Sequence, residues 1–118
     1  MTEADWARPL VHWEILARDP ATIRDFYSAM FNWEIADGRI MQIPAGIGGP
    51  EPGPAGHIRP SDTSRVVLYF QVLDLRASLE RAAELGGAVT REPFDVPGGP
   101  TIASITDPEG NPIVLVQQ

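Results

Sequence analysis

The chain has 118 residues, about the size of one domain. Hydrophobic residues make up 43% and charged residues 21%, which is typical of a globular protein and excludes a chain disordered throughout. The net charge is −7, and the nine basic residues are scattered arginines that form no basic stripe, so we expect no nucleic-acid partner. The absence of lysine excludes Schiff-base chemistry and the phosphate-binding lysine of a P-loop.

The sequence contains no cysteine, which excludes disulfides, thiolate nucleophiles and cysteine-ligated metals. Any metal would need His, Asp or Glu as ligands. No apolar run approaches the roughly 20 residues of a membrane-spanning helix, and the N-terminus lacks a basic segment followed by an apolar one. We therefore expect a cytoplasmic protein with no membrane partner.

Residues 1–9 are predicted to form a loosely held arm before the first strand, Leu10–Ala17. Because side chains alternate along a strand, His12, Glu14 and Leu16 share one face of it. These are the first polar candidates for a functional site.

A helix is predicted next, with Asp19 as N-cap and Pro20 in its first turn. Two short strands follow, Trp33–Ala36 and Arg39–Ile43, joined by an Asp-Gly turn. The sequence does not decide whether Trp33 faces the core or a cleft. Apolar residues at core-facing phases of the helix and strands are predicted to form the hydrophobic core: Trp13, Phe26, Tyr27, Met30 and Phe70.

Glycine and proline are dense from Pro44 to Pro60, which predicts a connecting loop with at most one short strand, around Gly46–Gly49. His57 falls in this connector, and we interpret it as a solvated loop residue.

The second half repeats the pattern of the first. A strand at Arg65–Leu73 precedes the N-cap Asp74 and a helix that stops at a Gly-Gly pair. His12 lies seven residues before Asp19, as Val67 lies seven before Asp74, so the two strand-to-helix segments align without a gap. Three further strands are predicted, the last two joined by the turn DPEGN: Ala88–Glu92, Thr101–Thr106 and Pro112–Gln117.

The predicted fold is therefore α+β, with two tandem βαβββ modules in one domain of residues 10–118. Module one covers about residues 10–49, a Gly/Pro connector about 50–64, and module two about 65–118. A ferredoxin-like fold is the structural alternative, because strand–helix–strand patterns are common without a true repeat.

The chain resembles the vicinal oxygen chelate superfamily, which includes lactoylglutathione lyase, bleomycin resistance proteins and extradiol dioxygenases. The segments that carry this resemblance, over about residues 10–117, are VHWEILARDPATIRDFYSAMFNWEI, LYFQVLDLRASLERAAELGGAV and ITDPEGNPIVLV. The resemblance implies a curved half-barrel sheet with helices on its convex side and a cleft on its concave face. It also implies a homodimer, and a divalent metal that binds substrate in the cleft.

The resemblance places a first-strand metal ligand at His12. The equivalent position of module two is Val67, and the last-strand position is Val114, while in module one the last-strand position falls in residues 45–49, which offer no ligand. One imidazole does not hold a catalytic ion, so we expect no metal cofactor. In the alternative, Glu14 and His57 join His12 as ligands of Zn, Ni, Mn or Fe.

The resemblance also implies that the cleft is lined by side chains alternating with the ligand positions. In one interpretation His12 and Glu14 are an acid–base pair that removes a proton beside a carbonyl, and Tyr69 or Gln71 hydrogen-bonds the oxyanion. In the other, Glu14 pairs with an arginine and His12 is a wall of the cleft. The expected lining is His12, Glu14, Leu16, Val67, Tyr69, Gln71, Val114 and Val116.

The first functional hypothesis is a glyoxalase-like small-molecule-binding protein with a degenerate metal site, which binds an apolar ligand or acts on it without metal. The second is a metal-dependent lyase, isomerase or dioxygenase that uses His12 and Glu14 as ligands. The third is a partner-binding domain without a ligand.

Overall fold

The computed structural model describes residues 7–45 and 53–118, folded as two compact units. The first unit is His12–Val67, and the second combines the residues before His12 with Leu68–Gln118. Each unit has its own hydrophobic core. Among the described residues, no helix is long and apolar enough to cross a membrane.

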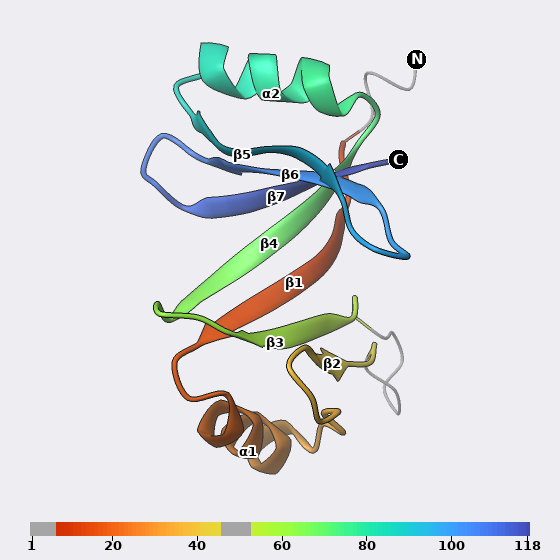
Figure 1. Cartoon of the computed structure of the whole chain (residues 1–118), viewed down its shortest axis with the longest axis vertical. Helices are drawn as coiled ribbons and strands as arrows, with labels where there is room; N and C mark the ends of the chain where they lie inside the picture. Colours follow the sequence, from red (N-terminus) through yellow and green to blue (C-terminus); the bar gives the residue numbers. More distant parts are fainter. Residues whose placement is uncertain (1–6, 46–52) are drawn as a thin grey trace. The chain divides into compact units, whose positions relative to one another are not determined.

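The first unit contains strand β1 (Leu10–Ala17, from His12 on), helix α1 (Pro20–Phe31) and strands β2 (Met41–Ile43) and β3 (Gly56–Pro60) (Figure 1). β3 pairs parallel with β1 and antiparallel with β2. The core of the first unit consists of buried side chains from these three strands: Ile15, Ala17, Met41, Ile43 and Ile58.

Helix α1 begins as its sequence predicts. The side chain of Asp19 accepts a hydrogen bond from the backbone N–H of Thr22, and Pro20 occupies the first turn. Asn32 ends the helix in the left-handed conformation, with φ of 59°.

The core predicted for α1 is wrong in part, because no residue of this helix is buried. Tyr27 packs against the core of the first unit, but Phe26 is 57% exposed and Met30 63% exposed. The helical spacing of apolar residues is present, but only one side of the apolar stripe meets the sheet.

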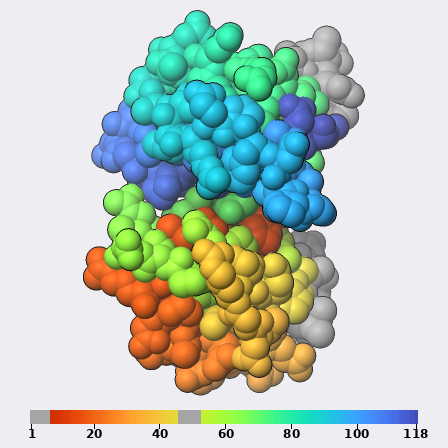
Figure 2. All heavy atoms as spheres, viewed as in Figure 1, coloured from red at the N-terminus to blue at the C-terminus, as the bar shows by residue number. Residues whose placement is uncertain are grey.

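The second unit contains strand β4 (Arg65–Val72, from Leu68 on), helix α2 (Leu75–Glu84), β5 (Ala88–Asp95), β6 (Thr101–Thr106) and β7 (Pro112–Gln117). These strands lie in the order β4–β7–β6–β5, with β4 parallel to β7 and the other pairs antiparallel. Figures 1 and 2 show α2, in green to turquoise, against β5, in teal. The core of this unit is Val72, Leu75, Leu79, Ala103 and Leu115.

The predicted α+β fold is confirmed, and β1, β6 and β7 have the predicted bounds. The DPEGN turn forms, with the Asp107 carboxylate accepting the backbone N–H groups of Glu109 and Asn111. The carbonyl of Pro9, in the predicted arm, accepts the N–H of Gln71 at 3.0 Å. Residues 1–6 of that arm and the strand expected at Gly46–Gly49 lie outside the described residues.

Two predictions about secondary structure are wrong. Trp33–Ala36 forms no strand, because its backbone contact with β2 is reduced to one hydrogen bond, from Ala36 N–H to the carbonyl of Gln42. The Gly/Pro connector is not simply a loop, since it contains β3. The alternation of β3, with Ile58 fully buried between two polar side chains, was hidden by the flanking glycines and prolines.

Candidate functional site

The pairing of β1 with β3 gathers four polar side chains on one face of the first unit. His12 and Glu14 alternate with Trp13 and Ile15, so they point away from the core beneath α1. The parallel register places His57 beside Glu14, and Arg59 beside Leu16. Alternation along β3 then puts His57 and Arg59 on the same face as His12 and Glu14.

These side chains form a continuous hydrogen-bonded series, which we call the His–His–Glu relay (His12, His57 and Glu14). Nε2 of His12 lies 2.8 Å from Nδ1 of His57, and Nε2 of His57 lies 2.6 Å from Oε2 of Glu14. Nε of Arg59 donates to the same carboxylate oxygen at 3.1 Å. A buried carboxylate thus anchors one end of the relay, and His12 forms the other end.

Burial and charge give the two ends of the relay different properties. Glu14 is 4% exposed, and burial alone would raise its pKa, but hydrogen bonds from His57 and Arg59 lower the pKa to about 2. The pKa of His12 is lowered by burial and then by the charge of His57, while the charge of Glu14 raises it. At neutral pH Glu14 is therefore a carboxylate and His12 a neutral imidazole.

An ionised Glu14 fixes which nitrogen of His57 carries the proton that faces it. The carboxylate only accepts, so His57 donates to it from Nε2. In the tautomer in which Nδ1 of His57 accepts, His12 donates from Nε2 and keeps a lone pair at Nδ1. That tautomer gives His12 the arrangement of a proton acceptor whose positive charge, once formed, is stabilised through His57 by Glu14.

The residues present do not fit the divalent metal that the resemblance implies. Two nitrogens that share a tetrahedral zinc ion stand about 3.3 Å apart, given zinc–nitrogen distances near 2.0 Å. His12 and His57 are closer than this, and Glu14 meets the opposite nitrogen of His57, so the three groups form a line and do not converge on one point. Within residues 7–45 and 53–118, no group of three or more His, Asp or Glu side chains is placed to hold a metal ion.

The interpretation of His57 as a solvated loop residue is wrong, because His57 lies in β3 and is 8% exposed. The strand register of the second unit shows which position of the repeat His57 occupies. Val114 in β7 pairs with Tyr69 in β4, as His57 in β3 pairs with Glu14 in β1. His57, and not residues 45–49, therefore stands at the last-strand position of the first repeat.

The same registers show that no side chain of the relay has a counterpart of the same kind in the second repeat. The seven-residue spacing before each N-cap makes Val67 the counterpart of His12 and Tyr69 the counterpart of Glu14. Val116 pairs with Gln71 as Arg59 pairs with Leu16. The relay is therefore built from residues of one repeat only.

The other predicted lining residues are placed within their own units. Leu16 is half-buried beside the relay, and Val67 is buried in the first unit. In the second unit Tyr69 and Gln71 are half-buried and share a face with buried Val114 and Val116, opposite the α2 core. That these residues line one cleft with His12, and that Tyr69 or Gln71 binds an oxyanion there, stay predictions.

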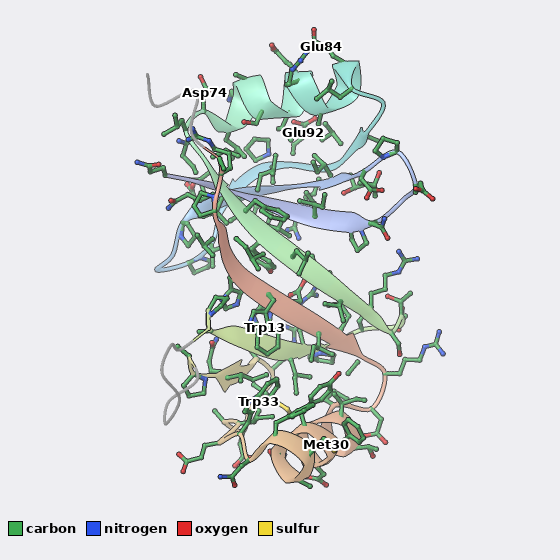
Figure 3. All side chains as sticks on the ribbon, turned by 180° about the vertical axis from the view of Figure 1, so that it is seen from behind. Trp13, Met30, Trp33, Asp74, Glu84 and Glu92 are labelled. Atoms are coloured by element: carbon green, nitrogen blue, oxygen red, sulfur yellow. The ribbon has the colours of Figure 1, made fainter. Side chains whose placement is uncertain are left out.

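A pocket of about 480 Å³ lies on the opposite face of β1, and we call it the aromatic pocket. Figure 3 shows two of its side chains, Trp13 and Trp33, which approach each other with ring centroids 5.5 Å apart. The structure thus places Trp33 on the core side, beneath α1. The pocket is lined by Trp13, Ile15, Tyr27, Trp33, Gly53, Pro54 and Val66.

Comparison with known proteins agrees with this fold. The glyoxalase-like domain family matches residues 12–116. The anthracycline biosynthesis protein DauV of Streptomyces sp. strain C5 is 36% identical over 114 residues, which cover 88% of this chain and 39% of DauV. The chain spans about two fifths of the length of the curated relatives it matches.

Two solved structures have the same fold at low sequence identity. A glyoxalase/bleomycin resistance protein/dioxygenase superfamily member from Vibrio splendidus 12B01 has a TM-score of 0.65 at 14% identity, covering 95% of this chain and 100% of that one. Methylmalonyl-CoA epimerase from Mycobacterium tuberculosis has a TM-score of 0.61 at 17% identity, covering 92% of this chain and 86% of the epimerase.

Proposed function

Because the chain belongs to the glyoxalase-like domain family of the vicinal oxygen chelate superfamily, we propose that it binds a small organic molecule and exchanges a proton with it at His12, without a metal. The observation that carries this proposal is the His–His–Glu relay, which orients a neutral imidazole and connects it to a buried carboxylate. The proposed setting is the cytoplasm, and the proposed assembly is a homodimer.

The proposed reaction is proton abstraction beside a carbonyl. Nδ1 of His12 takes the proton from carbon, and the electron pair of the C–H bond moves onto the carbonyl to give an enolate. The new imidazolium keeps its Nε2–H directed at His57, whose own Nε2–H is directed at Glu14. Returning the proton from His12 to carbon restores the carbonyl and completes the exchange.

The roles differ from the acid–base pair expected for His12 and Glu14. Glu14 is ionised, but its carboxylate is engaged by His57 and Arg59, so it acts on a ligand through the relay and not directly. The pairing of Glu14 with an arginine, the alternative interpretation, supports a positioning role for this carboxylate.

A relative named for anthracycline biosynthesis supports a ligand that is a small organic molecule. Leu16 lies on the same face of β1 as His12 and Glu14, which supports an apolar contact for the ligand, since small-molecule sites combine apolar walls with a few convergent polar groups. The hypothesis of a ligand-free partner-binding domain gives no role to a half-buried imidazole hydrogen-bonded to a buried one.

The proposal is tested by hydrogen–deuterium exchange beside the carbonyl of β-tetralone, an apolar ketone, followed by NMR in deuterated buffer. We expect the protein to accelerate the exchange and the variant His12→Gln to lower the accelerated rate by about a hundredfold, the usual contribution of a general base. Glu14→Gln should lower it as well, whereas Glu92→Gln, the same change on an exposed residue of β5, should leave it unchanged.

Exchange at the buffer rate with the unaltered protein, or equal rates for His12→Gln and the unaltered protein, would contradict the proposal. Calorimetric titration with Zn, Ni, Mn and anaerobic Fe(II) distinguishes the metal-dependent alternative. We expect no stoichiometric binding. One bound ion per chain whose binding is lost in His12→Gln would replace this proposal by metal-dependent chemistry.

A further inference from the structure

The two helices cover their sheets to different degrees. Leu75 and Leu79 of α2 are 3% and 6% exposed, so α2 closes the core of its unit. No residue of α1 is buried, and the aromatic rings beneath it stay half-exposed. The aromatic pocket is the space that α1 leaves open on this side of β1.

One wall of the pocket is an indole ring held flat against the backbone. Trp13 pairs with Gly56 across β1 and β3, and a Cβ placed on Gly56 would come within 2.4 Å of the indole. A glycine at this position is therefore what allows the ring to lie over β3. The indole N–H donates to the carbonyl of Pro54 at 2.8 Å, which fixes the orientation of the ring.

The other aromatic side chains of the pocket are also ordered by their neighbours. The rings of Tyr27 and Trp33 are nearly parallel, 6° apart in orientation, with centroids 5.5 Å apart. Trp33 also lies 5.5 Å from Trp13 at an interplanar angle of 45°. These contacts hold three large rings around one space, as Figure 3 shows for Trp13 and Trp33.

From this geometry we propose that the aromatic pocket binds a flat, uncharged aromatic molecule. Its volume of about 480 Å³ suits a small molecule, and ring faces offer stacking that a flat aromatic compound can use. None of the seven lining residues carries a charged side chain, which disfavours an ionic ligand. The pocket lies on the face of β1 opposite His12, so this site is independent of the proposed proton exchange.

The experiment measures binding of N-phenylnaphthylamine, an uncharged aromatic probe whose fluorescence increases in apolar surroundings. Val66 is 57% exposed at the edge of the pocket, so Val66→Trp fills the space with little effect on the core. Leu85→Trp is the matched control, because Leu85 is 61% exposed at the end of α2 in the other unit. Thermal unfolding checks that both variants are folded.

We expect one probe per chain, affinity reduced about tenfold in Val66→Trp, and affinity unchanged in Leu85→Trp. Trp33→Leu should also weaken binding, because it removes a stacking ring. Equal probe affinity in all variants would overturn the proposal. The proposal would also be overturned if the unaltered protein did not bind the probe and formed a dimer that Val66→Trp dissociates. A second copy of the chain would then occupy the pocket.

Discussion

At the scale of single residues, Glu14 anchors the His–His–Glu relay. A carboxylate in a strand could be a base, a metal ligand or part of an ion pair, and the sequence left these roles open. In the structure His57 and Arg59, more than 40 positions along the chain, donate to the same oxygen of Glu14, which supports a positioning role for this carboxylate. Contacts so distant in sequence follow from strand pairing, which composition and spacing do not show.

The lowered pKa of Glu14 predicts a specific loss of stability in acid. Its pKa is about 2 in the folded chain against an ordinary value of 4.5, so the unfolded state binds more protons between these values. The carboxylate therefore stabilises the fold above about pH 4.5, and this contribution decreases as pH falls toward 2. The full contribution of Glu14 to the free energy of unfolding is about 3 kcal/mol. We expect about 2 kcal/mol of it to be lost between about pH 6 and about pH 3.

Urea unfolding at several pH values measures this effect. Between about pH 6 and about pH 3 the unfolding free energy of Glu14→Gln should fall by about 2 kcal/mol less than that of the unaltered protein. Glu92→Gln, on exposed β5, should keep the steep fall. Parallel curves for Glu14→Gln and the unaltered protein would show that the Glu14 carboxylate is not stabilised as described.

At the scale of elements, the sequence predicts helices and strands that have clear alternation or capping residues. It does not predict those that are short or rich in glycine. The helix starts at Asp19 and Asp74 were predictable because a carboxylate that caps backbone N–H groups acts locally. Strand β3 was missed because five residues between prolines and glycines resemble a loop until a partner strand is known. His57 was missed for the same reason.

The unequal burial of the two helices predicts losses of stability of different size for two truncations. Leu79→Ala in α2 removes a side chain that is 6% exposed and should lower the free energy of unfolding by about 2–4 kcal/mol. Phe26→Ala in α1 removes a larger side chain that is 57% exposed, and should cost less than about 1 kcal/mol. Denaturant unfolding compares the two, and a larger loss for Phe26→Ala would mean that α1 is buried in solution.

At the scale of the whole molecule, the repeat in the sequence predicts the plan of the fold but not the placement of the chemistry. Both repeats pair their first strand parallel with their last. The first repeat carries His12 and His57 at the positions where the second carries Val67 and Val114. Substitutions at matching positions leave a fold unchanged while altering its site, so the fold was predictable and the complete relay was not.

The exposed apolar side chains of α1 give the proposed homodimer a testable surface. Phe26, Met30 and Phe31 are each more than half exposed, and a cluster of this kind is typical of a protein–protein contact. Sedimentation should give twice the 12.8 kDa chain mass for the unaltered protein and the single mass for Phe26→Glu with Met30→Glu. The exposed pair Leu85→Glu with Val89→Glu is the control, and a monomeric unaltered protein would refute the homodimer.

The parallel pairing of β1 with β3 has a consequence for how the protein folds. A parallel pair requires a crossover, and here α1 and β2 lie in the chain between the two strands. His12 and His57 are separated by 45 positions, so their contact closes a long loop. Closing this loop lowers the entropy of the chain before strand pairing can stabilise it. Because such distant contacts slow folding, the imidazole pair should assemble after the local helices, late on the folding pathway.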